Sequence, residues 1–157
     1  MSESVLNGKQ ILAVDDEPDV LQVLEQEIMD ACPDCVIDTA TTHERAVMLL
    51  ESKPYDIVIL DIMGVNGFAL LDLAVKKGLK VAMLTAHALN PEALKKSIEM
   101  KARAYLPKEK LGEIVPFLED ILQYDYESGW KRLMDKLYDF FKDRFKDDWE
   151  MKTWIDK

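Results

Sequence analysis

Five side chains that could do chemistry together each lie at or just beyond the end of a short apolar run. They are Asp15, Asp16, Asp61, Thr85 and Lys108. Crowded carboxylates repel one another, so such a group persists where a divalent cation that prefers oxygen ligands, such as Mg²⁺, holds it. A threonine hydroxyl and a lysine ammonium could then bind phosphoryl oxygens. The set suits transfer of a phosphoryl group onto Asp61, whose carboxylate would be the nucleophile.

Asp61 ends the most apolar of these runs. Residues 55–61 read as a fully buried strand, because residues 57–60 are apolar and mostly β-branched and Pro54 precedes the run. A buried strand is a costly place for a negative charge, except at its carboxyl end, where open α/β sheets bind ligands. We therefore expect Asp61 to be the reacting group.

Five strands alternate with five short helices along the chain. The predicted strands are 9–14, 35–40, 55–61, 80–85 and 104–106, and the predicted helices are 18–31, 42–50, 68–77, 91–100 and 111–123. Pro18 and the Asn90–Pro91 pair are typical of helix starts, and Gly78 of a helix end. This alternation predicts an α/β fold with a parallel sheet covered by helices on both faces. The first, third, fourth and fifth strands would end at one crevice, which brings the five side chains together.

Composition narrows the possible functions. The chain has 157 residues, is 48% hydrophobic and carries a net charge of -10, enough for one globular domain and an appendage. An acidic chain has no general attraction for nucleic acid or anionic membranes, so neither is an expected partner. No apolar run approaches the roughly 20 residues of a membrane span, and residues 1–4 lack a signal-peptide pattern. We expect a cytoplasmic protein.

Cys32 and Cys35 form a C-x-x-C pattern, which can be a redox pair or half of a zinc site. A zinc site needs about four ligands, and His43 is the only further candidate nearby. A thioredoxin-like pair opens a helix directly after a strand, whereas this pair follows a predicted helix. We expect two reduced thiols without a function of their own.

Four short motifs carry a resemblance to a known family. They are Val14–Pro18 (VDDEP), Asp56–Met63 (DIVILDIM), Leu84–Ala86 (LTA) and Ala104–Lys108 (AYLPK). Over residues 9–123 the chain resembles the receiver domain of two-component response regulators. The resemblance implies a flavodoxin-like fold of five parallel strands with helices on both faces.

The resemblance also implies roles for the acidic residues. Asp61 would accept a phosphoryl group from the phosphohistidine of a histidine kinase or a histidine phosphotransfer protein. Asp16 would bind Mg²⁺ directly and Asp15 largely through water. The backbone carbonyl of Met63 would complete the protein ligands.

A conformational switch is implied as well. Thr85 would bond the aspartyl phosphate, Lys108 would pair with it, and Tyr105 would be the rotating aromatic residue coupled to Thr85. Phosphorylation adds about 1.5 to 2 negative charges and three acceptor oxygens, toward which Thr85 and Lys108 can move. Tyr105 could then turn inward, changing the face made by the fourth helix, fifth strand and fifth helix. An ordinary half-buried tyrosine is the alternative.

Three positions depart from the family pattern or bear on phosphate lifetime. The loop 61–67 reaches its glycine two residues earlier than usual and lacks the usual proline. Glu109 follows Lys108 where the family has a proline after a cis bond. A cis bond to glutamate would cost roughly 2.5–4 kcal/mol, so we predict a trans bond there. His87, two residues after Thr85, could tune attack by water on the phosphate, or simply face solvent.

Residues 124–157 form an extension in which 124–129 reads as a break and 130–150 as one helix. Large apolar side chains recur every four residues, at Leu133, Leu137, Phe141, Phe145 and Trp149. The segment is too short for a winged-helix output domain and lacks a basic recognition helix. Its stripe must bury against the receiver, against a second copy in a homodimer through 130–150, or against another protein.

We therefore expect domain 1–123 to be a receiver and 124–157 a helical extension for packing, dimerisation or partner binding. The leading hypothesis is a stand-alone, Mg²⁺-dependent receiver that switches a surface for an unknown output protein. It would be no enzyme beyond phosphotransfer to itself and self-catalysed dephosphorylation. A degenerate receiver that works without phosphate is the alternative. A phosphohydrolase of the haloacid dehalogenase type would need an acid where Met63 stands, and a nucleotide-binding domain would need a glycine-rich loop after the first strand.

Overall fold

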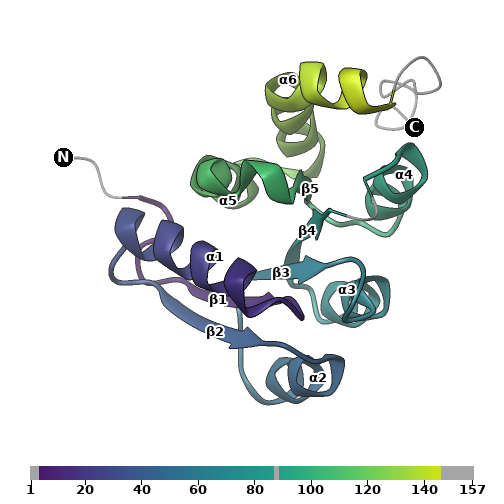
Figure 1. The fold of residues 1–157 in the computed structure, drawn as a ribbon. Coiled ribbons are helices and arrows are strands. Elements are labelled where there is room, and N and C mark those ends of the chain that lie inside the picture. The colour runs from purple at the N-terminus through teal and green to yellow at the C-terminus, as the bar shows by residue number, and fades with distance from the viewer. Residues whose placement is uncertain (1–3, 87–88, 146–157) are drawn as a thin grey trace.

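The structure is a computed structural model that describes residues 4–86 and 89–145. Five parallel strands form one sheet in the order β2-β1-β3-β4-β5 (Figure 1). They are β1 (Gln10–Val14), β2 (Val36–Ala40), β3 (Ile57–Asp61), β4 (Lys80–Thr85) and β5 (Ala104–Pro107). This strand order is that of the flavodoxin-like fold, as expected.

Helices cover both faces of the sheet. They are α1 (Pro18–Ala31), α2 (His43–Ser52), α3 (Gly67–Lys76), α4 (Pro91–Glu99), α5 (Ile114–Gln123) and α6 (Tyr126–Phe145). Helices α1 and α5 lie side by side on one face, and α2, α3 and α4 lie on the other (Figure 1). Helix α6 extends beyond α5 at the β5 edge. The predicted layers are confirmed.

The central position of β3 in the sheet explains why this strand is continuously apolar up to Asp61. All five residues of β3 are buried, because the strand lies in the middle of the sheet and both of its faces are covered. In the register of the sheet, Val14 pairs with Leu60 and Asp61 pairs with Leu84. The ends of β1, β3 and β4 therefore meet at one edge, where the chemistry-bearing side chains follow.

Two predicted boundaries are wrong. The helix expected over 111–123 is a 3-10 helix at Lys108–Glu113 followed by α5, so Pro116 stands in the first turn of α5, where its missing N–H costs nothing. The break expected over 124–129 covers only two residues, because α6 begins at Tyr126 and includes Gly129. A helical glycine costs only about 1 kcal/mol, which the burial of Trp130 outweighs.

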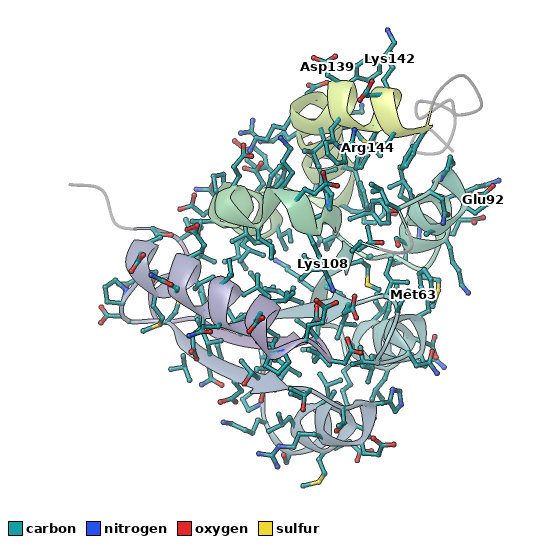
Figure 2. The ribbon with its side chains drawn as sticks, viewed as in Figure 1. Met63, Glu92, Lys108, Asp139, Lys142 and Arg144 are labelled. Carbon is teal, nitrogen blue, oxygen red and sulfur yellow. The ribbon has the colours of Figure 1, made fainter. Side chains whose placement is uncertain are left out.

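Helix α6 packs against the α/β domain of its own chain. Six apolar side chains on one face of the helix are buried: Trp130, Leu133, Met134, Leu137, Phe141 and Phe145. Asp139 and Lys142 point away from the rest of the molecule (Figure 2). The expectation that the stripe must be buried is confirmed, and the structure shows it covered within the chain. A homodimer through 130–150 would compete for these side chains; residues 146–150, with Trp149, lie outside the described residues.

The two cysteines are free thiols and both are buried. The Cys35 thiol donates a hydrogen bond to the Leu6 carbonyl at 2.8 Å. Burial, and next the neighbouring Cys32, raise the pKa of Cys35 to about 12, which keeps the thiol protonated and unreactive. His43 does not join them, because its Nδ1 lies 2.9 Å from the Val65 carbonyl oxygen. The absence of a function for these thiols stays a prediction.

Among the helices within 4–86 and 89–145, none combines the length and the apolar character that crossing a membrane requires.

Candidate functional site

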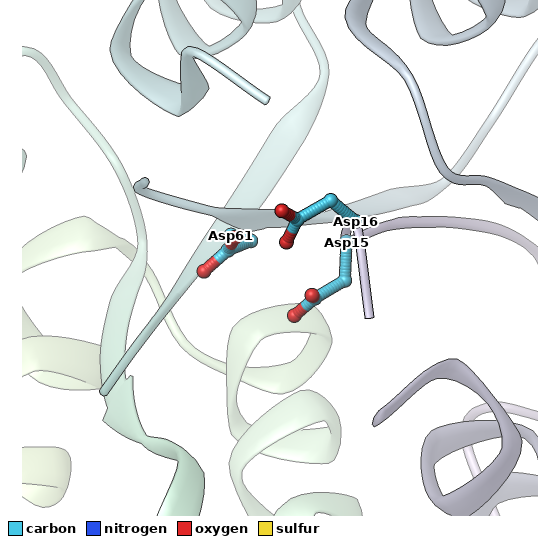
Figure 3. A group of neighbouring side chains, drawn as sticks. All are labelled: Asp15, Asp16 and Asp61. Carbon is cyan, nitrogen blue, oxygen red and sulfur yellow. The ribbon is translucent and has the colours of Figure 1, made fainter. Parts of the chain in front are cut away.

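Three carboxylates meet at the carboxyl edge of the sheet. Asp15 and Asp16 follow β1 and Asp61 ends β3, and one oxygen from each lies within 4.8 Å of the others (Figure 3). Asp15 is 0% and Asp61 4% exposed, whereas Asp16 is open to solvent. Adjacent parallel strands bring the three together, as the sequence predicts.

Lys108 joins the cluster from the end of β5. Its Nζ lies 2.9 Å from Asp15 Oδ2 and 3.1 Å from Asp61 Oδ1. The exposed Glu17 carboxylate is farther away, at 3.5 Å. Lys108 is therefore held between the two buried aspartates, where the predicted phosphoryl-binding role requires it.

Burial and neighbouring charges together shift the pKa values of Asp61, Asp15 and Lys108. Burial, and next the charge of Asp15, raise the pKa of Asp61 to about 6, although Lys108 opposes the shift. Burial also raises the pKa of Asp15. For Lys108, burial alone would lower the pKa, but its contacts with Asp15 and Asp61 outweigh that and raise the pKa above its ordinary value. The site is thus short of positive charge.

This donor set fits a magnesium ion. Three carboxylates and one ammonium leave two negative charges uncompensated at the centre of the cluster. Apart from its ion pair with Lys108, the buried Asp15 Oδ2 has no hydrogen-bond partner among the described residues. Carboxylate oxygens are the ligands that Mg²⁺ prefers, and a divalent ion would balance the excess charge. The Met63 carbonyl accepts a 2.8 Å hydrogen bond from the Val65 amide, so its role as a ligand stays a prediction.

The shortened loop after Asp61 is tight and depends on its glycines. Gly64 has φ +77°, and a Cβ there would lie 2.6 Å from the Asp16 carboxylate. Asn66 also has a positive φ, of 55°, and the Gly67 amide bonds the Ile62 carbonyl at 3.0 Å. His43, at the start of α2, contacts the Val65 carbonyl of this loop. The sequence did not predict the close approach of Gly64 to Asp16 or the contact of His43 with Val65. A glycine in so short a loop was a signal for the first, and no signal pointed to the second.

Replacing Gly64 with alanine is expected to weaken Mg²⁺ binding by about tenfold, because the new methyl group must displace the Asp16 carboxylate. Calorimetric titration with Mg²⁺ measures the change. Gly78→Ala is the matched control, since Gly78 has φ +79° but an added Cβ would meet no atom within 4 Å. Both variants carry the same backbone strain, roughly 1–2 kcal/mol. Equal Mg²⁺ affinity in the two variants would show that Gly64 does not shape the metal site.

Thr85 and Tyr105 are directly linked behind the cluster. Thr85 ends β4 and is 1% exposed, and Tyr105 of β5 is fully buried. The Tyr105 hydroxyl accepts a 3.1 Å hydrogen bond from the Asn90 amide, and it also hydrogen-bonds the Thr85 side chain. Burial raises the pKa of the Tyr105 phenol, so it stays neutral. Tyr105 is thus fully buried rather than half-buried, and its role in a switch stays a prediction.

The second departure from the family pattern does not displace the lysine. The described residues contain no cis peptide bond, so the predicted trans bond between Lys108 and Glu109 is confirmed. Pro107 pairs with Thr85 as the last residue of β5, and Lys108 still reaches both buried aspartates. His87 lies outside the described residues, so its effect on phosphate lifetime stays a prediction.

Comparisons with known proteins agree with this geometry. The family model described as "Response regulator receiver domain" matches residues 11–118. The two-component response regulators ARR18 and ARR12 of Arabidopsis thaliana are 36% and 34% identical over 104 and 105 residues, or 64% of this chain in each case. The matched stretches are only 16% and 17% of the length of those relatives.

A solved structure shows the same fold. The CheY-like response regulator receiver domain protein from Methanospirillum hungatei JF-1 is 25% identical, with a TM-score of 0.60 over 71% of this chain and 94% of that chain. The family model spans most of the chain, and the matched segment contains the carboxylates, the threonine and the lysine of the site. The chain therefore belongs to the family of response regulator receiver domains.

Proposed function

We propose that the chain is a phospho-acceptor switch that takes a phosphoryl group onto Asp61 from a phosphohistidine donor in a Mg²⁺-dependent reaction. The observation that carries this proposal is the meeting of three carboxylates with Lys108 at one sheet edge. The donor would be a histidine kinase or a histidine phosphotransfer protein of the cytoplasm. We further propose that phosphorylation changes the contact of the receiver with another protein.

In this reaction an Asp61 carboxylate oxygen attacks phosphorus, the phosphorus–nitrogen bond of the donor breaks, and its electron pair returns to the histidine ring. A bound Mg²⁺ would supply positive charge to the phosphoryl oxygens and would be held by Asp15, Asp16 and Asp61. Lys108 neutralises part of the charge that arrives, and the Thr85 hydroxyl can donate to a phosphoryl oxygen. The pKa of about 6 leaves Asp61 ionised, and therefore nucleophilic, at neutral pH.

The chain would turn over no separate substrate. Its chemistry would be limited to accepting the phosphoryl group and losing it to water. A degenerate receiver that works without phosphate is less well supported, because Lys108 keeps its contacts with both buried aspartates despite the altered turn.

Small phosphodonors test the proposal without knowledge of the cognate kinase. Incubation with phosphoramidate, which has a phosphorus–nitrogen bond, or with acetyl phosphate is expected to add the mass of one phosphoryl group when Mg²⁺ is present. Chelation of Mg²⁺ should prevent the gain. Reduction of the acyl phosphate followed by peptide mapping should place the modification at Asp61. No gain with either donor, or a gain that maps elsewhere, contradicts the proposal.

A further inference from the structure

Helix α6 packs against α5 and β5 and reaches α4 at its first residue, so it lies on the face formed by α4, β5 and α5 (Figure 1). At its start, the Tyr126 hydroxyl donates to the Ile98 carbonyl of α4 at 2.6 Å. The Trp130 indole N–H donates to the Ala102 carbonyl, just before β5, at 2.9 Å. The helix therefore closes the face that the switch hypothesis assigns to partners.

Charged pairs fix α6 on the neighbouring helix and beside the site. Asp120 of α5 is 8% exposed and lies 2.7 Å from Lys136 Nζ and 3.3 Å from Arg132 Nε. Arg144, near the end of the described helix, pairs with Glu109 at 3.1 Å. Glu109 directly follows Lys108 in the chain. One residue therefore contacts α6 while its neighbour contacts the acidic cluster. The Arg144 pair is exposed and contributes position more than free energy.

The ring of Tyr105 connects α6 to the acidic site. Its centroid lies 5.8 Å from that of Phe141, which stacks on Phe145 at 5.2 Å. At the other end of the tyrosine, the hydroxyl bonds Asn90 and Thr85. An outward rotation of the fully buried Tyr105 ring would drive it into the volume that Phe141 fills. The docked helix therefore holds Tyr105 in its inward position.

We propose that α6 is the resident occupant of the α4–β5–α5 face and that its docking and phosphorylation of Asp61 stabilise each other. This proposal rests on the proposed function. When Thr85 turns toward a phosphoryl oxygen, the Asn90 backbone still holds the Tyr105 hydroxyl, and the space that Thr85 leaves favours the inward ring. Helix α6 docks against the inward ring of Tyr105. A phosphoryl group that favours this inward ring must therefore strengthen the docking of α6. By the same coupling, the docked α6 must strengthen binding of the phosphoryl group or its mimic to the same degree.

In the phosphorylated protein, α6 would therefore cover the α4–β5–α5 face more firmly, and the face would be less accessible to a partner. A partner that binds the face would have to displace α6, and would therefore prefer the unphosphorylated protein. Signal output would then depend on whether α6 is docked and on the outer surface of the docked helix.

Hydrogen exchange of the full chain tests the coupling, with Mg²⁺ and beryllofluoride as a phosphoryl mimic. In the wild-type protein, the mimic is expected to slow exchange of α6 amides as well as those of the 61–67 loop. In Phe141→Ala, the beryllofluoride concentration that half-protects the loop is expected to rise about fivefold or more. Tyr138→Ala, on the exposed side of the same helix, is the matched control and should behave as wild type.

The outcomes separate the two proposals. Protection of the 61–67 loop with unchanged or faster exchange in wild-type α6 overturns the coupling and leaves the phospho-acceptor function intact. The same holds if Phe141→Ala and Tyr138→Ala need equal beryllofluoride concentrations. If no segment of the wild-type protein responds to Mg²⁺ with beryllofluoride, the proposed function fails and the coupling fails with it. The wild-type exchange experiment decides the direction even where Phe141→Ala folds poorly.

Discussion

An Asp61→Asn protein is expected to accept no phosphoryl group and yet to be more stable than the wild-type chain in the absence of Mg²⁺. The first effect follows because an amide cannot replace the carboxylate nucleophile. The second follows because the burial of Asp61 and the nearby charges of Asp15 and Asp16 destabilise its ionised form. The phosphoryl gain is measured by intact mass, and the free energy of unfolding by urea titration with a chelator present.

The size and pH dependence of the stabilisation follow from the pKa of Asp61. This pKa is about 6 in the folded protein, against 3.8 for an ordinary aspartate carboxyl such as the unfolded chain exposes. Above pH 6 both states are ionised and the fold bears the full penalty, about 3 kcal/mol at roughly 1.4 kcal/mol per pH unit. As the pH falls from 6 to 3.8, the folded protein takes up the proton first and the penalty disappears. The advantage of Asp61→Asn should therefore be full at about pH 8 and absent near pH 3.5.

Asp72→Asn is the control for this experiment. Asp72 forms an exposed pair with Lys76 on α3, so its replacement should change stability by less than about 1 kcal/mol at any pH. Equal stability of Asp61→Asn and wild type at pH 8 would show that Asp61 is not destabilised by its neighbours. Phosphoryl uptake by Asp61→Asn would show that another residue is the acceptor.

The sequence predicted the site because parallel topology determines which strand ends meet. Once the apolar runs around Val14 and Leu60 are taken as neighbouring strands, Asp15 and Asp61 must lie at the same edge, whatever their side-chain conformations. The apolar runs and helix caps also locate most elements to within a few residues. The contact of Gly64 with Asp16 was not predictable, because it depends on the path of one short loop.

The extension shows the limit of a periodic pattern. Spacing of apolar side chains establishes that a helix has a face to bury, but it carries no information about what covers the face. The contact of Phe141 with Tyr105 joins two elements far apart in the chain, and no local signal specifies it. The break predicted around Gly129 was wrong for a different reason. The local preference of glycine against helix was overridden by the packing of the adjacent Trp130.

Replacing Trp130 with alanine is expected to lower the free energy of unfolding of the whole domain by about 3–5 kcal/mol. The indole is 0% exposed, and its N–H donates to the Ala102 carbonyl. Alanine would leave a cavity between α6 and β5 and a buried carbonyl without its partner, and both costs add to the lost apolar burial. Urea titration followed by far-ultraviolet circular dichroism measures the change.

Tyr138→Ala separates packing from helix propensity in this test. Tyr138 lies on the same helix but is 45% exposed, so its replacement should change stability by less than about 1 kcal/mol. If α6 is an integral layer of the fold, Trp130→Ala shifts a single transition to lower urea. Instead, part of the helical circular dichroism signal could be lost in a separate early step while the main transition keeps the wild-type midpoint. In that case, α6 contributes nothing to the stability of the sheet beneath it. That result would remove the packing on which a coupling between α6 and Tyr105 depends.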